Sequence, residues 1–505
     1  MSSELKIKTI DKEITSRKAD YSQWYLDIIS AADLAEYGPV KGCMVIKPYG
    51  YALWERTQQI LNEKFKETGV QNAYFPLFIP EKYLNKEKEH IEGFAPEVAV
   101  VTHAGGKKLD EPLVVRPTSE TIMYESFSRW IHSYRDLPLL INQWANVVRW
   151  EMRPRLFLRT VEFLWQEGHT VHETEQEADD RARMMLAIYK DFAENIMAIP
   201  VITGTKSESE KFAGALRTYS LEAMMQDGKA LQFATSHNLG QNFAKAFDVK
   251  FLDRNSTEQY GWQTSWGLST RTIGGLIMTH SDDKGLVLPP KIASIQAVIT
   301  TIIPSENDKD VVNNKAKELN DLLNAGGVRS HVDVRDMRPG KKYYEWEKKG
   351  VPIRIELGPK DIADESAMLV RRDTGEKSKA SLKSLVETVT SMLNEIQQNL
   401  FNRAVEYRKT KTKTVDTWDE FVKAIEEGNF YESLEFSASH KLPILIIIED
   451  NGWSLATRTE ERRSNIDMQK LSGSFGIKYE KLSGNDVFEY IEKIENLEGK
   501  MESKS

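Results

Sequence analysis

Seven side chains that could bind a charged, flat ligand lie close together near residue 150. They are two arginines, two carboxylates, two aromatic rings and a histidine: Arg149, Glu151, Arg159, Phe163, Trp165, Glu167 and His169. The stretch predicts two β-strands, one over residues 146–151 and one from residue 157 onward, separated by a loop with Pro154. Alternate side chains of a strand share a face, so these groups should line one surface. Because burying unpaired charges is costly, that surface should face a ligand with anionic, flat and cationic parts.

A salt-bridged surface hairpin is the alternative explanation of this pattern. Large aromatic rings are a poor choice for a face that is merely solvated, which favours a binding surface. The spacing Arg-x-Glu, loop, Arg-x-x-x-Phe resembles motif 2 of the class II aminoacyl-tRNA synthetases. Within it, FLRTVEFLWQEGH is similar to the form found in prolyl-tRNA synthetases, and the resemblance extends over roughly residues 20–400.

Two other segments resemble motifs of the same family. Thr118-Ser119-Glu120 could simply begin a helix, because hydroxyl and acidic residues are common at helix starts, but it also matches the T-x-E motif of substrate recognition. Residues 263–290 resemble motif 3, in which Arg271 lies among glycines that permit close backbone approach. Three independent segments therefore match the family in the right order.

The resemblance implies a role for each matching residue. Arg149 and Arg271 would be catalytic, because phosphoryl chemistry needs positioning and charge neutralisation more than a protein nucleophile. ATP with Mg2+, L-proline and tRNA(Pro) would be the ligands. The ATP site would comprise Arg149, Glu151, Arg159, Thr160, Phe163, Gln232, Thr235, Ser269 and Arg271. The proline site would comprise Thr118, Glu120, Arg149, Trp165, Glu167, His169 and His237, with Phe212 as a further candidate.

Composition limits the other classes of function. The 505 residues are 40% hydrophobic and 29% charged, as in ordinary globular proteins, and a net charge of −8 argues against general nucleic-acid coating. Since neither a membrane-spanning run nor a signal-peptide core is evident, we expect a cytoplasmic protein without membrane contact. The single cysteine, Cys43, argues against disulfides and a cysteine-rich zinc site.

Three domains of α/β or α+β type are predicted. The resemblance implies a class II catalytic domain with an antiparallel sheet over residues 1–290 and an α/β anticodon-binding domain over residues 291–400. Residues 401–505 should form a small α/β domain around an apolar strand at residues 442–448. Archaeal-type relatives often bind zinc through cysteines in this last domain, but here it contains none, so no zinc site is expected.

Segments between the motifs carry further expectations. A helix over residues 51–68 and a strand interrupted by Pro76 look like motif 1, which builds a homodimer interface in the family. Residues 81–110 are polar and predicted to form a loop. Residues 170–263 are too few for the editing insertion of bacterial-type enzymes. The anticodon contacts, or simply a solvated helix face, would involve Arg338, Lys341, Lys342, Tyr343, Trp346 and Arg354.

The predicted function is that of the archaeal and eukaryote-like prolyl-tRNA synthetases without an editing insertion. Such an enzyme activates L-proline with ATP and transfers the prolyl group to tRNA(Pro). One alternative is a class II synthetase for another amino acid, such as threonine, although a threonyl enzyme would need a zinc ligand that is missing. Another is a non-catalytic RNA-binding paralogue. Such relatives usually lose a phosphate-binding arginine, whereas Arg149, Arg159 and Arg271 are all present.

Overall fold

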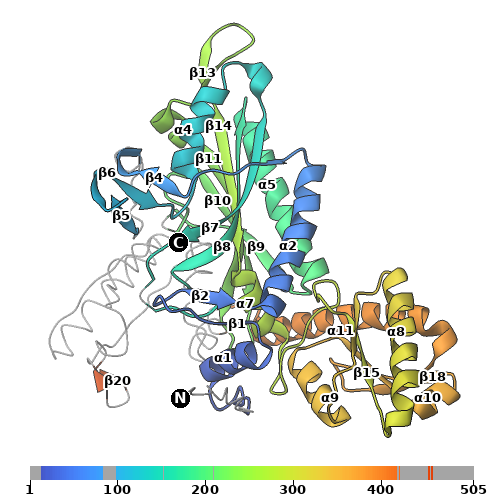
Figure 1. Ribbon diagram of the computed structural model, residues 1–505. Helices are drawn as coiled ribbons and strands as arrows, with labels where there is room; N and C mark the ends of the chain where they lie inside the picture. Colours follow the sequence, from blue (N-terminus) through green and yellow to red (C-terminus); the bar gives the residue numbers. More distant parts are fainter. Residues whose placement is uncertain are drawn as a thin grey trace. The chain divides into compact units, whose positions relative to one another are not determined.

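The computed structural model describes residues 13–83, 98–151, 153–208, 210–417, 420, 453–454 and 457–458. It divides into two compact units, one of residues 1–205 and 212–411 and the other of residues 206–211 and 412–505. The first unit contains both large sheets (Figure 1). In the second, the structure describes one small antiparallel pair, β20 (Trp453–Ser454) with β21 (Thr457–Arg458). The strand predicted at residues 442–448 lies outside the described residues.

A seven-stranded sheet forms the centre of the first unit. Its neighbours are antiparallel except for the first pair, which is parallel. The strand order is β3 (Gln71–Asn72), β7 (Leu139–Val148), β8 (Glu162–His172), β14 (Trp262–Ser269), β11 (Ala230–Gly240), β10 (Arg217–Met224) and β9 (Val201–Thr205). The antiparallel sheet expected for the catalytic domain is therefore present.

One face of this sheet is apolar and is covered by two long helices, α2 (Pro48–Glu67) and α5 (Glu175–Asp191) (Figure 1). The Trp54 ring of α2 meets the Trp144 ring edge-on at 5.7 Å, and the α2 ring of Phe65 lies 6.5 Å from that of Trp266. The polar side chains predicted to bind ligands point to the opposite face because strand side chains alternate.

Strand register aligns the polar residues of that opposite face into rows. Gln143, Glu167, Gly267 and Thr235 pair in turn across β7, β8, β14 and β11. In the next row His169, Ser265, His237 and Thr218 pair across β8, β14, β11 and β10. Because a register slip of one residue would turn every one of these side chains to the other face, the apolar packing under α2 and α5 fixes the site above.

The chain before α4 forms a three-stranded antiparallel sheet. Its strand order is β4 (Phe78–Pro80), β6 (Lys107–Val115) and β5 (Val100–Ala104). The prediction of a loop over residues 81–110 is wrong for residues 100–104 and 107–110, which are strand, and for residues 81–83, which are helical. Gly105 and Gly106, with φ of 59° and 76°, form the turn between β5 and β6. Most of the residues on these strands contact solvent, so their polar composition resembles that of a loop.

The second large sheet of this unit has five strands and is mixed parallel and antiparallel. Its order is β16 (Ser330–Asp333), β15 (Ala297–Thr301), β17 (Ile353–Leu357), β18 (Ser366–Arg371) and β19 (Lys377–Ser381), of which the first three are parallel. The strands alternate with helices as the sequence predicts, and an apolar core fills the space between them. The helices are α8 (Lys309–Ala325), α9 (Pro339–Lys348), α10 (Pro359–Ala363) and α11 (Leu385–Lys411).

Two residues expected to contact RNA from α9 are buried instead. Lys342 is 1% exposed, and its Nζ donates hydrogen bonds to Oγ1 of Thr301 and the carbonyl oxygen of Asp333, each at 3.1 Å. The indole Nε1 of Trp346 donates to the Asp333 carboxylate at 2.8 Å. The helical periodicity of α9 turns both side chains toward the sheet, so neither is available for RNA.

Shorter elements complete the described part of the chain. No helix in it is both long and apolar enough to cross a bilayer. The remaining elements are α1 (Tyr21–Ala31), β1 (Ala35–Tyr37), β2 (Met44–Ile46), α4 (Glu120–Trp130), η1 (Tyr134–Asp136), η2 (Phe192–Ile196), α6 (Asn242–Phe247), β12 (Lys250–Leu252), β13 (Glu258–Tyr260), α7 (Arg271–His280), η3 (Glu306–Asp308) and η4 (Leu382–Ser384).

A substitution at Gly168 tests whether the stability of the sheet depends on tight packing of its apolar face. A Cβ at this position would lie 2.1 Å from Cε2 of Trp266, a buried ring that cannot move freely. We expect Gly168→Ala to destabilise the protein by about 1–3 kcal/mol through overpacking. Thermal unfolding should show a lower transition temperature. Gly204→Ala on β9 is the matched control, because nothing lies within 4 Å of its added Cβ; an equal effect of both changes would contradict the interpretation.

Candidate active site

The two arginines predicted from motif 2, the catalytic Arg149 and the ATP-binding Arg159, lie in a loop rather than on strands. β7 ends at Val148 and β8 begins at Glu162, so the prediction that the second strand starts at residue 157 and carries Arg159 is wrong. The chain leaves the sheet because Leu156 and Phe157 turn into the hydrophobic core, where they are 4% and 2% exposed. Phe157 adopts a positive φ of 61°, and the Leu156 carbonyl oxygen accepts a hydrogen bond from the Tyr25 hydroxyl at 2.8 Å.

Glu167 on β8 is a buried carboxylate held by donors from three elements. Ser119 donates to it from both its hydroxyl and its backbone N–H, the latter at 3.2 Å. Nε2 of Gln143 donates at 3.1 Å, and Nε2 of His169 lies 3.2 Å away. The other ring nitrogen of His169 contacts the Tyr124 hydroxyl at 2.9 Å. The network ties the start of α4 to two strands of the central sheet.

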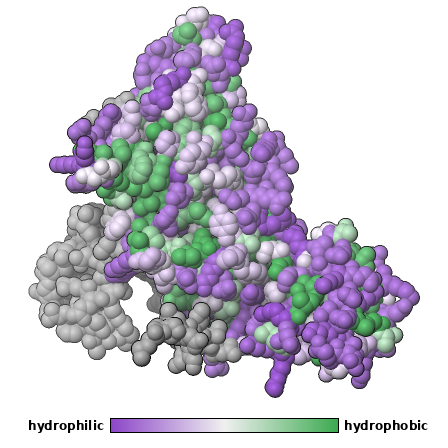
Figure 2. All heavy atoms as spheres, in the orientation of Figure 1, coloured by the Kyte–Doolittle hydropathy of each residue, from purple (hydrophilic) through white to green (hydrophobic). Residues whose placement is uncertain are grey.

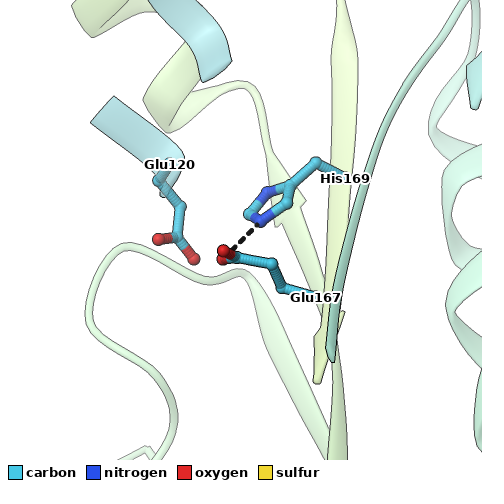
Figure 3. Close-up of side chains that lie close together, drawn as sticks. All are labelled: Glu120, Glu167 and His169. Carbon is cyan, nitrogen blue, oxygen red and sulfur yellow. Dashed lines mark hydrogen bonds and ion pairs between the residues drawn. The ribbon is translucent and has the colours of Figure 1, made fainter. Parts of the chain in front are cut away.

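Glu120 lies beside this network and differs from Glu167 in its partners. Figure 3 shows the Glu120 carboxylate, from the first turn of α4, pointing toward Glu167 and His169. Within the described residues its carboxylate accepts one hydrogen bond, from the hydroxyl of Thr118. Glu120 is 4% exposed, so its remaining lone pairs have little access to water. A buried carboxylate with unused acceptor capacity favours a cationic ligand.

Ionisation in this pocket follows from the contacts. Burial by itself favours neutral forms, but the hydrogen bond with Glu167 and the charges of Glu120 and Glu167 outweigh it and raise the pKa of His169. For Glu167, burial is likewise outweighed by the donors His169, Ser119 and Gln143, which lower its pKa. The favoured state is therefore an ion pair beside Glu120.

These groups fit an organic cation better than a metal ion. Glu120, Glu167 and His169 each present a potential ligand atom within 4.8 Å of the others. However, both ring nitrogens of His169 already have hydrogen-bond partners, and its raised pKa favours the protonated ring, which cannot coordinate a metal. His172, another histidine of β8, bonds to Oγ1 of Thr170 at 2.8 Å and is no part of this group.

Arg149 lies at the mouth of the acidic pocket. Its Nε donates to the carbonyl oxygen of Pro117 at 2.9 Å, and its guanidinium lies 5.6 Å from the ring of Phe163 and 5.5 Å from that of Trp165. The residue contacts solvent, yet surrounding protein partly replaces water and lowers its pKa, an effect that the charges of Glu120 and Glu167 oppose. A cation that contacts solvent therefore lies over two aromatic rings.

Two further cations complete this region. Burial, together with the charges of Arg149 and Arg159, lowers the pKa of Arg271, so the three guanidinium groups sense one another. Arg271 begins α7, and its N–H donates to Oγ of Ser269 at 3.1 Å. The Arg159 side chain is 65% exposed, and its Nε lies 3.5 Å from the Glu151 carboxylate. Three like charges from two distant segments call for a polyanionic ligand.

The other predicted residues occupy neighbouring positions. Thr160 is buried, and its hydroxyl donates to the Glu162 carbonyl oxygen at 2.8 Å. His237 contacts the Thr218 hydroxyl through Nδ1 at 2.9 Å and packs against the Phe212 ring at 4.8 Å. Gln232 and Thr235 lie on β11, next to β14, and their contacts with a nucleotide stay predictions.

Sequence reasoning missed three residues of the site. Ser119 was expected only as a possible helix cap, but its hydroxyl serves Glu167 and makes no cap hydrogen bond. Gln143 pairs directly with Glu167 across β7 and β8, and Tyr124 lies one helical turn after Glu120. The signal for Gln143 was its strand position once the register is known, whereas the helical spacing of Tyr124 was readable from the sequence.

Comparisons with known proteins agree with the fold and this surface. The family model described as tRNA synthetase class II core domain (G, H, P, S and T) matches residues 102–280, and the Anticodon binding domain model matches residues 299–392. A Dehydrogenase E1 component model matches residues 403–493, few of which the structure describes. The antiparallel sheet, its arginines and these matches define a class II aminoacyl-tRNA synthetase.

Relatives of nearly the same length narrow the class further. "Proline--tRNA ligase" of Chloroherpeton thalassium is 59% identical over 475 residues, which cover 93% of this chain and 94% of the relative. The protein of the same name from Chlorobaculum tepidum is 55% identical over 461 residues, with coverage of 91% and 95%. A crystal structure of prolyl-tRNA synthetase from Cryptosporidium parvum, complexed with halofuginone and AMPPNP, is 43% identical and covers 83% of each chain with a TM-score of 0.76. The chain belongs to the proline–tRNA ligase family, which confirms the expected enzyme class and fold class.

The ion pair in the pocket predicts a pH-dependent stability. The contribution of His169 is complete below its ordinary pKa of 6.5 and is lost as the pH rises through its raised pKa. That of Glu167 is complete above its ordinary pKa of 4.5 and is lost as the pH falls through its lowered pKa. We therefore expect His169→Gln to lower the unfolding temperature most between pH 4.5 and 6.5.

Thermal unfolding of wild type and variant from pH 4 to pH 9 measures this difference. A loss of about 1 kcal/mol should lower the transition by roughly 2–4 °C. His103→Gln is the control, because His103 is exposed on β5. A wild-type-to-variant difference that stays constant across the pH range would contradict the ion pair.

Proposed function

We propose that this chain ligates proline to tRNA(Pro) in two steps at the face formed by β7, β8, β14 and β11. The observation that carries the proposal is the convergence of Arg149, Arg159 and Arg271 beside a buried carboxylate pocket. The cations suit the phosphates of ATP, and the carboxylate suits the ammonium of an amino acid. No Ser-His-Asp or Cys-His arrangement is required for this chemistry.

In the first step a carboxylate oxygen of proline attacks the α-phosphorus of ATP, and the bond to pyrophosphate breaks. We assign Arg149 to both reactants, because its guanidinium senses the charges of Glu120 and Glu167 and itself acts on Arg271. Its positive charge draws the two anions together and stabilises the negative charge that builds up on the phosphoryl oxygens. In the second step a terminal ribose hydroxyl of tRNA attacks the acyl carbon, and AMP leaves.

The proline pocket uses the groups that the protein leaves partly unpaired. The secondary ammonium of proline carries two donors, which the Glu120 carboxylate and the Thr118 hydroxyl oxygen can accept. Trp165 and His237 form the walls beside the ring, with Phe212 behind His237. Glu167 is already saturated by protein donors, so we assign it to holding His169 and the start of α4 rather than to direct proline contact.

The nucleotide binds along the motif 2 loop and the start of α7. Phe163 and the Arg271 guanidinium enclose adenine, while Arg159 contacts the outer phosphates. Mg2+ prefers oxygen ligands, and the part-exposed carboxylate of Glu151 is a suitable donor beside those phosphates. Thr160, Gln232, Thr235 and Ser269 supply the remaining polar contacts.

The five-stranded domain holds the anticodon end of the tRNA. Among the residues proposed from the sequence, Tyr343 and Arg354 stay at the surface of the sheet, with the guanidinium 4.4 Å from the ring centre. Stacked aromatic and guanidinium planes suit unstacked RNA bases. Arg338 and Lys341 at the start of α9 provide phosphate contacts.

The active form is proposed to be a zinc-free homodimer in the cytoplasm. Hydrophobic side chains gather on the surface near the three-stranded sheet (Figure 2). In the chain on either side of Pro76 and on β5, the large hydrophobic residues Tyr74, Phe78 and Val100 are 72%, 46% and 43% exposed. Burying such a patch against a second copy of the chain would remove it from water, in keeping with the motif 1 resemblance of this segment.

Proline-dependent ATP–pyrophosphate exchange tests the proposed function. We expect exchange with proline and none with threonine, and Arg149→Ala should reduce the rate by on the order of a hundredfold or more, because charge-assisted contacts contribute roughly 1.5–3 kcal/mol each. Arg129→Ala is the matched control, since Arg129 on α4 is 59% exposed and pairs with Glu125. Exchange with another amino acid would indicate a different synthetase, and silence with every amino acid would indicate a non-catalytic paralogue.

Proofreading in cis is expected to be absent. A pocket shaped for a five-membered ring still admits alanine, because missing methylenes contribute only about 1–3 kcal/mol to discrimination. Residues 170–263 are occupied by α5, the strands β9 to β13 and short connections, which leaves no room for a hydrolytic domain. Purified protein should therefore leave alanyl-tRNA(Pro) intact over the time in which it charges tRNA with proline. Hydrolysis faster than the enzyme-free rate would refute this.

A further inference from the structure

Arg116 is a buried arginine with an unusual set of partners. The residue is 1% exposed, and no carboxylate pairs with it among the residues that the structure describes. Its Nη1 donates to the carbonyl oxygen of Phe75 at 2.7 Å. Its Nε and Nη2 donate to the backbone and side-chain oxygens of Asn146, at 2.8 and 3.0 Å. Burying a charge without a carboxylate partner is costly, and here three hydrogen bonds to fixed oxygens and the Tyr74 ring, 5.6 Å from the guanidinium carbon, compensate it.

The backbone of Arg116 joins the same two segments as its side chain. Its N–H donates to the Leu77 carbonyl oxygen at 3.0 Å, and its own carbonyl oxygen accepts from the Val148 N–H at 3.0 Å. One residue thus fastens the segment around Phe75 and Leu77 to the end of β7. β7 stops at Val148, which pairs with Glu162 of β8. The N–H of Val148 bonds to Arg116 instead of to another strand of the seven-stranded sheet.

Two of the attachments of Arg149 depend on neighbours of Arg116, beside its backbone bond to Val161 and its contacts with the rings of Phe163 and Trp165. The backbone of Arg149 follows Val148 directly, and its Nε donates to the carbonyl oxygen of Pro117, the residue after Arg116. The same segment continues into Thr118 and Glu120, the groups proposed for the proline ammonium. A shift at Arg116 would therefore move the cation and the carboxylate of the site relative to each other.

We propose that Arg116 is a positioning residue for adenylate formation, which rests on the proposed function. It contacts neither substrate; its planar fork fixes where the guanidinium of Arg149 stands above the Glu120 pocket. A lysine could keep the charge but not the fixed directions of three donors, because an ammonium is a compact group on a flexible stem. Misplacement of a reacting contact by about 1 Å can cost on the order of a hundredfold in rate.

Arg116→Lys tests the proposal, with Arg129→Lys on the exposed face of α4 as the matched control. We expect the turnover of proline-dependent exchange per competent site to fall about tenfold to a hundredfold. The KM for proline should change by a smaller factor than the turnover, because Glu120 and Thr118 still bind the ammonium and Arg149 keeps its charge, and the affinity for tRNA should not change. Active-site titration counts the competent sites by the initial release of pyrophosphate.

The titration separates positioning from a merely structural role. Loss of folding would reduce the number of competent sites at normal turnover per site, and that result would overturn the proposal. Asn146→Ala removes one acceptor and leaves Arg116 in place, so a loss of about two- to tenfold in the same parameter is expected. Normal turnover in Arg116→Lys would overturn this inference alone. Absence of proline-dependent exchange in the unaltered protein would overturn the proposed function and this inference together.

Discussion

The site depends on a buried carboxylate that is saturated by donors of the protein. Glu167 lies 2% exposed on a strand whose other face packs under two helices, so it cannot move toward water to lower its free energy. Its charge is tolerable because Ser119, Gln143 and His169 surround it. Removing one donor would leave a buried charge under-satisfied, and the arrangement therefore holds α4 and two strands in a single relation.

That relation gives the pocket two carboxylates with different functions. Glu167 spends its lone pairs on the protein, whereas Glu120, one helical turn away from Tyr124, keeps acceptor capacity directed at the same space. If both carboxylates were free, their mutual repulsion would raise the pKa of one of them and weaken its hold on a cation. Pairing the first with His169 leaves a single net negative charge, which suits the proposed binding of a single ammonium.

The arginines differ from Glu167 in two ways. They lie on a loop and at a helix start rather than inside a strand, and their charges are not balanced by one another. Arg149 and Arg159 lie in the loop between β7 and β8, and Arg271 begins α7. Like charges in this arrangement repel one another, and this repulsion adds to the larger effect of burial in lowering the pKa of Arg271. The free energy of that repulsion is recovered only when a polyanion enters, so the fold favours a bound nucleotide over an empty site.

The sequence could predict the residues of this site that lie on strands better than those that lie on loops. Period-two alternation placed Phe163, Trp165, Glu167 and His169 on one strand face, and the structure agrees. Residues whose position depends on tertiary packing could not be placed. Arg159 was expected on a strand because the apolar run from Phe157 to Trp165 looks like one, but the chain leaves the sheet there and Phe157 fills the core.

Long-range pairing explains the remaining differences. Nothing near Ser119 or Gln143 in the sequence announces that Glu167 lies beside them, since they are separated from it by 48 and 24 residues. Likewise the helical spacing of α9 could be read, but not which face meets the sheet, and so Lys342 looked like a phosphate ligand while it bonds to Thr301. From the sequence alone, a buried charged residue looks the same as a surface residue when its polar partner lies on a distant strand. The two can be told apart only once the register of the sheet is known. Side-chain chemistry that completes itself inside the fold is therefore hidden from the sequence, whereas chemistry left incomplete for a ligand, as at Glu120 and Arg149, stays visible in its motifs.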